Sequence, residues 1–507
     1  MKIRRTKLLL AIVICLPIVC RTDRVYAQNS ALVTVRRVLL LSIDGFHGLD
    51  LATFVRTHPS STLAHLSSSG VTYTEAFTSK PSNSFPGLLA LVTGGSPLST
   101  GVWYEGAYAR TLSPPGSDCK TVGTEVLWSN ALDKNKKLLD AGGGIDPAKL
   151  PLDPAKGCVQ VYPHNFLRVN TIFEVAHSAG LRTAWIDKHP SYEMVSGPSG
   201  TGVDDLFTPE IGSAARDVKS QEAYDDVKVE GVLNEIAGKD HAGKPAEGEP
   251  ALLGMAFQAF RFAQVIPTGG YTDASGTPSA PLLDVIEHTD QSIGKMVSAL
   301  KARGLLESTL IIITAKHGQA PMDRSKHRLV DDTIIPDMVN RIQSGLVALS
   351  YADGNITSVW LTDQSQTQKV AEALNQPVNQ TAAGIQSVLW GESLKLMTKG
   401  PGGDNRVPDI VVIPNLGVLY APADEQGIAG HGGFSDDDTH VALLLSSTGL
   451  SPRIIRTPVQ TTQVAPTILQ ALGIDPGSLQ AVQQEKTTIL PGLFAGPRSL
   501  LRLLNSE

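Results

Sequence analysis

Short runs of consecutive apolar residues, separated by amphipathic patterns, constrain the fold of this chain more than any other feature of its sequence. Such runs offer apolar side chains to both faces of a strand, which is typical of strands buried inside a parallel sheet. The strands expected on this basis are 38–43, 182–186, 310–314, 410–413 and 441–445. The helices expected between them include 170–179 and 284–302. This alternation predicts an α/β fold with a doubly wound, mainly parallel sheet and helices on both faces.

Two segments interrupt the alternation. Residues 101–165 are rich in Gly, Pro and Asp and show little periodicity, so we expect a long ordered excursion there. Residues 345–400 contain a strand pattern and two helix-like stretches, which indicate a small inserted subdomain. With 47 Gly and 32 Pro among 507 residues, long loops are expected. We therefore predict one large domain over 28–507 whose inserted segments cover the functional site.

The first 27 residues have the pattern of a signal peptide. Basic residues precede an apolar run over 8–20, and Val25-Tyr26-Ala27 offers a cleavage site. The run is short for a membrane span, and lipid attachment at Cys20 is disfavoured because Ile18-Val19 fits that signal poorly. No later stretch is apolar over 18 residues, so we expect an exported mature chain without a transmembrane segment, located in the periplasm or secreted.

Charge and cysteine content narrow the function classes. The formal net charge of −6 gives no basic footprint, so a nucleic-acid polymer is not an expected partner, and the oligomeric state is left open.

After the signal segment, Cys119 and Cys158 are the only cysteines in the sequence. In an oxidising compartment one disulfide between them is favoured, with two unpaired buried thiols as the alternative. Two cysteines alone do not make a tetrahedral zinc site.

Four polar residues fall where strands end or helices begin. Asp44 follows the first strand, His317 follows the strand at 310–314, and His431 precedes the strand at 441–445. Ser84 opens a helical stretch. Each has an ordinary structural explanation when taken alone, as a helix cap or a loop residue. Because open α/β sheets bind ligands at the carboxyl ends of their strands, the four together predict a functional site.

The segments around these residues resemble the type I phosphodiesterase/nucleotide pyrophosphatase family of the alkaline phosphatase superfamily, in the same order over about 36–475. The matching segments are 38–46, Ser84-Phe85-Pro86, 91–94, 314–318, 430–432 and 464–469. The resemblance implies an alkaline-phosphatase-like fold and a small-molecule phosphate ester as substrate. It further implies two zinc ions, which polarise the phosphate and activate the nucleophile. On this basis Ser84 forms a covalent phosphoryl-enzyme, Asp44, Ser84 and His317 line one metal, and His431 lines the other.

The chain departs from the family pattern at three places. The family's Asp before His317 is Lys316, whose ammonium is a poor zinc ligand but can act as a point charge against an anion. The family's Asp-x-x-x-His pair should fall near 254–264, where this chain has neither Asp nor His. Asp284 and His288 have that spacing but are the weaker candidates. Glu105 stands near the family's oxyanion-binding Asn and is a candidate replacement ligand, so one or two zinc ions are expected.

The strand at 182–186 is followed by Asp187-Lys188-His189, a segment expected to approach the site, in which Lys188 and His189 are the candidates for substrate contact. The acidic run 436–438 is expected to be a solvated turn. Three functions stay open at this point. The first is a metal-dependent hydrolase of phosphate esters that uses Ser84 and Lys316. The second is a hydrolase of another ester, such as a sulfate or a phosphonate. The third is an exported binding protein that keeps the fold without catalysis.

Overall fold

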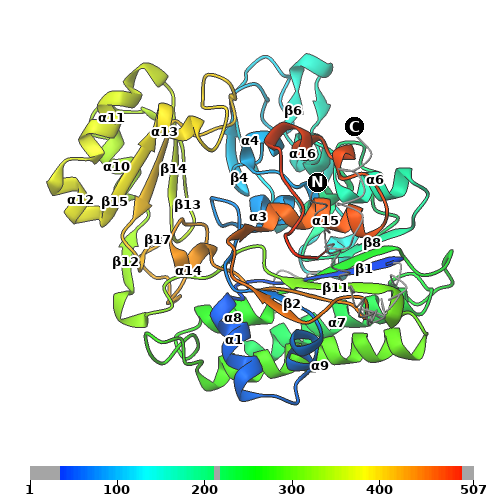
Figure 1. Ribbon diagram of the computed structural model, residues 1–507. Coiled ribbons are helices and arrows are strands. Elements are labelled where there is room, and N and C mark those ends of the chain that lie inside the picture. Colours follow the sequence, from blue (N-terminus) through cyan, green and yellow to red (C-terminus); the bar gives the residue numbers. More distant parts are fainter. Residues whose placement is uncertain (1–34, 210–216, 494–507) are drawn as a thin grey trace, which may run out of the picture.

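The computed structural model describes residues 35–209 and 217–493 (Figure 1). The expected signal peptide, 1–27, lies outside the described residues. Within these ranges no helix combines the length and the apolar character needed to cross a membrane.

An eight-stranded sheet forms the centre of the molecule, in the order β19-β2-β18-β11-β1-β10-β8-β9. Its strands are β19 (Arg453–Ile455), β2 (Val71–Tyr73), β18 (Leu443–Ser446), β11 (Thr309–Thr314), β1 (Arg37–Ile43), β10 (Leu252–Phe257), β8 (Thr183–Ile186) and β9 (Asp205–Phe207). The five strands from β11 to β9 are parallel, and β18 runs antiparallel to both of its neighbours. The predicted α/β class with a mainly parallel sheet is confirmed.

Helices cover both faces of this sheet (Figure 1). Along β1, Val38 and Leu40 join the core on one face, while Leu39 and Leu41 join the core on the other, which is why the run is apolar at consecutive positions. The first core contains α3 (Ser84–Thr93), α6 (Ile172–Ser178) and α15 (Val464–Ala471), with the shorter α4 (Pro97–Thr100), α5 (Pro163–Phe166) and α16 (Gln480–Glu485) near it. The second contains α1 (Gly48–Thr57), α2 (Thr62–Ser69), α7 (Val218–Ile236), α8 (Ala259–Val265) and α9 (Ala280–Ala302).

A separate antiparallel sheet, ordered β13-β14-β16-β15, builds a smaller unit beside the main one. Its strands are β13 (Val347–Ala352), β14 (Thr357–Leu361), β16 (Ile410–Pro414) and β15 (Ile385–Trp390), and its helices are α10 (Ile334–Asn340), α11 (Thr367–Leu374), α12 (Pro377–Ala383) and α13 (Glu392–Lys395). The placement of 410–413 among the main strands was therefore wrong. Val412 packs in the core of this unit and Val411 packs against Trp103, so both faces of β16 are covered and its sequence looks like that of a parallel strand.

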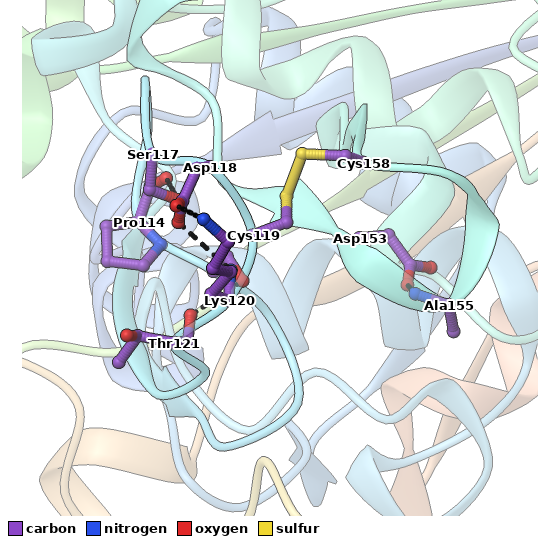
Figure 2. Close-up of a disulfide and its surroundings, with 10 residues drawn as sticks. Pro114, Ser117, Asp118, Cys119, Lys120, Thr121, Asp153, Ala155 and Cys158 are labelled. Carbon is purple, nitrogen blue, oxygen red and sulfur yellow. Dashed lines mark hydrogen bonds and ion pairs between the residues drawn. A yellow bond between two sulfur atoms is a disulfide. The ribbon is translucent and has the colours of Figure 1, made fainter.

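The excursion at 101–165 is ordered by two hairpins and one cross-link. The hairpins pair β4 (Gly106–Ala109) with β5 (Thr124–Leu127) and β6 (Leu152–Asp153) with β7 (Val159–Gln160). The expected disulfide between Cys119 and Cys158 is present, with their Cα atoms 6.0 Å apart (Figure 2). The short pairs β12 (Arg328–Asp331) with β17 (Val418–Ala421) and β3 (Ala76–Phe77) with β20 (Val459–Gln460), and α14 (Asp436–Thr439), complete the elements around the site.

Candidate active site

Charged side chains gather where the parallel strands of the main sheet end. Asp44 follows β1, the pair Lys316 and His317 follows β11, and Lys188 follows β8 by two residues. Ser84 opens α3 beside them. Because the carboxyl ends of parallel strands share one edge of a sheet, residues far apart in the sequence meet here.

Ser84 is held in place by the way α3 begins. The Asn83 side chain caps the helix by accepting a hydrogen bond from the Phe85 amide at 3.2 Å. Gly87 lets the first turn lie directly on the chain at Lys316, because a Cβ on Gly87 would stand 1.9 Å from the Lys316 carbonyl oxygen. The serine hydroxyl is thereby fixed at an amide-rich helix start, which favours a bound anion.

Lys188 joins Ser84 to Asp44. Its ammonium lies 3.0 Å from Asp44 Oδ2 and 3.5 Å from Ser84 Oγ. Burial alone would lower the pKa of Lys188, but the Asp44 carboxylate raises it above its ordinary value. Lys188 is therefore a stable cation beside the candidate nucleophile.

Lys316 is a second, fully buried cation on the same carboxylate. Its ammonium lies 3.5 Å from Asp44 Oδ1 and donates to Asp187 at 3.2 Å, and it stands 4.6 Å from the centre of the Tyr192 ring. Burial lowers the pKa of Lys316, while Asp187 and Asp44 oppose that shift. Burial also disfavours the Asp44 carboxylate, yet Lys188 and Lys316 hold the pKa of Asp44 well below its ordinary value. Asp44 thus serves as the counter-ion of two lysines.

The three candidate histidines are buried, and burial holds each pKa below the ordinary value. His317 donates from Nδ1 to the Gly318 carbonyl at 2.8 Å, its Nε2 faces Asp44 Oδ2 at 3.9 Å, and its pKa falls to about 3. The His431 ring lies 4.0 Å from the His317 ring, centre to centre. His189 packs against Tyr192 on η5 (Pro190–Ser196), and Lys188 lowers its pKa further. All three are neutral at pH 7.

The inserted segments contribute a carboxylate pair. Glu105 accepts a hydrogen bond from the Tyr351 hydroxyl at 2.9 Å, and Asp353 accepts one from the Asn83 amide at 3.4 Å, beside Ser84. Burial raises the pKa of both acids, and the charge of Glu105 helps to raise that of Asp353 to about 7. The positive charge of Arg261, on α8, opposes both shifts.

Sequence reasoning missed two of these residues, Arg261 and Asp353, as site members. Asp187 belongs to the segment after 182–186 that the sequence places near the site, and it accepts a hydrogen bond from Lys316 there. Arg261 lies in the segment where only the absence of Asp and His drew notice. Asp353 lies in an insertion, and no local pattern in the sequence indicates that it reaches Ser84.

Two further candidates from the sequence, the pair Asp284 and His288 and the acidic run 436–438, have partners outside the cluster around Ser84. Asp284 bonds to Lys219 at 2.6 Å and His288 to Asp226 at 3.1 Å, both on α7 rather than in the site. Within 436–438, Asp438 is buried and accepts a hydrogen bond from Ser435, where it closes the cap of α14. The expectation of a solvated acidic turn is therefore wrong for Asp438.

The side chains present do not fit a two-zinc centre. Two of the places that should supply ligands hold Lys316 and the segment of Arg261, and neither an ammonium nor a guanidinium donates an electron pair to zinc. Asp44 is already shared by two ammonium groups. Over residues 35–209 and 217–493, no cluster of three or more His, Cys, Asp or Glu is arranged to hold a metal ion. The ligand roles expected for Asp44, Ser84, His317, His431 and Glu105 stay predictions.

The mainly parallel sheet with helices on both faces gives the chain an alkaline-phosphatase-like fold. The family model for type I phosphodiesterase / nucleotide pyrophosphatase matches residues 38–435, and the chain belongs to that family. No curated protein matches the chain.

Solved structures share the fold at low identity. Murine ectonucleotide pyrophosphatase / phosphodiesterase 5 is 15% identical, with a TM-score of 0.55, over 87% of this chain and 96% of that chain. An inactive variant of the same murine protein, in complex with AMP, gives 15% and a TM-score of 0.56 with the same coverage. Alkaline phosphatase PafA gives 13% and a TM-score of 0.57, again over 87% and 96%. The resemblance expected from the sequence motifs is confirmed.

Proposed function

We propose that this protein is an exported hydrolase of small phosphate esters in which Ser84 is the nucleophile. One observation carries the proposal: Ser84 Oγ, at the start of α3, lies 3.5 Å from the Lys188 ammonium, which also contacts Asp44. A fixed positive charge favours the deprotonated, nucleophilic form of a hydroxyl. Family membership supports a phosphate ester as the substrate class. The proposed reaction does not depend on the two zinc ions that the resemblance implies, because the side chains present do not fit a two-zinc centre.

In this proposal the Ser84 oxygen forms a bond to phosphorus, and the ester bond to the leaving oxygen breaks. The leaving oxygen takes the electron pair of that bond and the proton that the Ser84 hydroxyl gives up, so it departs as an alcohol. Water then attacks the phosphoryl-serine, which releases the phosphate product and restores Ser84. Lys188 contacts the phosphoryl oxygens, and Lys316 keeps Asp44 and Asp187 from repelling them. His189 stays neutral and positions Tyr192 through ring packing.

The test compares hydrolysis by the wild type, Ser84→Ala and a matched Ser292→Ala control. Ser292 is a fully buried serine on α9, on the opposite face of the sheet from α3. A panel of phosphate diesters, monoesters, a sulfate ester and a phosphonate ester is assayed with and without added zinc. We expect Ser84→Ala to lose activity by about a thousandfold or more, as removal of a nucleophile does elsewhere, and Ser292→Ala to keep it. Hydrolysis that survives in Ser84→Ala would overturn the nucleophile assignment.

A non-catalytic binding protein is the second candidate. The observation that favours it is the double engagement of Asp44 by Lys188 and Lys316, which removes the carboxylate from metal ligation. This candidate expects no hydrolysis of any ester by the wild type, with or without zinc, together with binding of phosphate esters that Ser84→Ala retains.

A further inference from the structure

We infer that Lys188 and Arg261 bind the phosphate group directly while the buried Lys316 compensates the carboxylates around them, so that phosphate binding at this site needs no divalent metal ion. The inference rests on the proposed phosphate-ester specificity and extends it to the origin of the positive charge. It starts from the mismatch between the family's metal ligands and the side chains found here. Where the family has Asp, this chain has Lys316, and the segment that should hold an Asp and a His holds Arg261 instead.

The three cations come from three different elements and meet around one edge of the sheet. Lys188 follows β8, Lys316 follows β11, and Arg261 lies on α8 after β10. Lys188 and Lys316 both contact the buried Asp44, at 3.0 Å and 3.5 Å. Arg261 lies beside the same strand end, because a Cβ on Gly45, the residue after Asp44, would stand 3.5 Å from the Arg261 Cα. The groups therefore form one cluster rather than three separate ion pairs.

The charge balance of this cluster favours an anion. Asp44 and Asp187 neutralise two of the three cations, which leaves one positive charge on the side of Ser84. Glu105 and Asp353 are engaged by other partners, since they accept hydrogen bonds from the Tyr351 hydroxyl and the Asn83 side-chain amide. Within the described part of the chain, the buried Arg261 Nε has no hydrogen-bond partner. An N–H group in that state is available to a phosphate oxygen.

Cations fixed in the protein can replace some of what a metal ion does. They neutralise phosphate oxygens and donate charge-assisted hydrogen bonds, whereas they do not activate a bound water as zinc does. This division separates phosphate binding, which we expect to be metal-independent, from hydrolysis, which is tested separately. Sulfate shares the same charge and geometry and is expected to compete for the cluster.

The experiment measures binding of inorganic phosphate by calorimetry to the protein purified without metal and treated with EDTA. Variants Lys188→Met and Arg261→Met each remove one cation, and Lys295→Met, a half-exposed lysine on α9, is the matched control. A charged hydrogen bond to a partly buried group accounts for on the order of tenfold or more in affinity. We expect each site variant to weaken phosphate binding by that factor, and both EDTA and the control variant to leave it unchanged.

Several outcomes would overturn the inference. They are phosphate binding that disappears with EDTA and returns with zinc, site variants that bind as the wild type does, and a wild type that binds no phosphate at all. Lys316→Met is a further variant, but it leaves two buried carboxylates with less compensation, so its folding is checked by circular dichroism. Hydrolysis that depends on Ser84, together with phosphate binding that EDTA abolishes and zinc restores, would refute the inference while the proposed function stands. Metal-free phosphate binding without hydrolysis would refute catalysis while the inference stands.

Discussion

Asp44→Asn is the substitution that most directly tests the electrostatic design of the site. It removes the negative charge but keeps the shape of the side chain, and it leaves Lys188 and Lys316 without the counter-ion they share. The two ammonium groups lie 3.0 Å and 3.5 Å from the carboxylate oxygens, and Asp44 is fully buried. At an effective dielectric constant of about 20, each contact corresponds to a Coulomb energy of about 5 kcal/mol before desolvation is subtracted.

The net effect is smaller, because the buried charges are also costly to desolvate. Breaking a buried ion pair by removing one partner destabilises proteins by about 3–5 kcal/mol, and we expect a loss of that size for Asp44→Asn at pH 7. Added phosphate should restore part of the loss, since an anion supplies the missing negative charge. The assay is urea unfolding of EDTA-treated protein, followed by tryptophan fluorescence, with and without phosphate. Asp424→Asn, at an exposed position, is the control.

If Asp44 served only as a metal ligand, the expected effect of Asp44→Asn on the free energy of unfolding would be the opposite. Without metal, such a ligand is one of several acidic groups that repel one another, so its neutralisation would leave stability unchanged or raise it. A change in unfolding free energy below about 1 kcal/mol, within the range of ordinary surface substitutions, would refute the counter-ion argument.

Three other predictions follow from particular contacts. Replacing Cys119 and Cys158 by Ser should lower the free energy of unfolding by about 4 kcal/mol, because the disulfide closes a loop with a sequence separation of 39. Unfolding in urea measures this loss, and an unchanged midpoint would contradict the prediction. Gly87→Ala should both destabilise the protein and abolish hydrolysis, since the new Cβ would meet the Lys316 carbonyl oxygen at 1.9 Å; a folded, active variant would show that α3 moves freely. Asp353 has a pKa of about 7 in the folded protein, above its ordinary value, so its contribution to stability is complete below about pH 4 and is lost as the pH rises through 7. Asp353→Asn should flatten the stability profile between these values, and an unaltered slope would count against the assignment.

Four of the eight strands of the main sheet could be predicted from the sequence, namely β1, β8, β11 and β18. The runs at 38–43, 182–186 and 310–314 became β1, β8 and β11, because strands covered on both faces carry apolar residues at consecutive positions. The same rule failed to separate β16 from them, since Val411 and Val412 are buried on opposite faces of a different sheet. Burial determines the apolar pattern, whereas pairing partners do not, so the pattern alone could not assign the sheet.

The candidate site likewise contains residues that the sequence pattern indicates and a residue that it does not. Asp44, Ser84, Lys188 and His317 stand at element ends, and the periodic pattern marks those ends along the chain. Asp353 reaches the site only because the inserted unit packs beside α3, where Asn83 bonds to it. A contact of that kind depends on the tertiary placement of two segments separated by 270 residues, which no local signal in either segment specifies.

The presence of Lys316 where the family has an acidic residue affects metal ligation and the charge of the site in opposite ways. With respect to metal ligation, the lysine removes one of the family's ligands and so indicates a lost function. With respect to charge, the lysine places an ammonium group between Asp44 and Asp187, at the edge of the sheet where Lys188 contacts Ser84. A scaffold that had merely lost its metals would gain nothing from burying two lysines completely or nearly so, because each buried cation costs several kcal/mol unless it is paired. The pairing with Asp44 and Asp187 offsets that cost and keeps positive charge beside the serine, which is the arrangement that an anion-binding site requires.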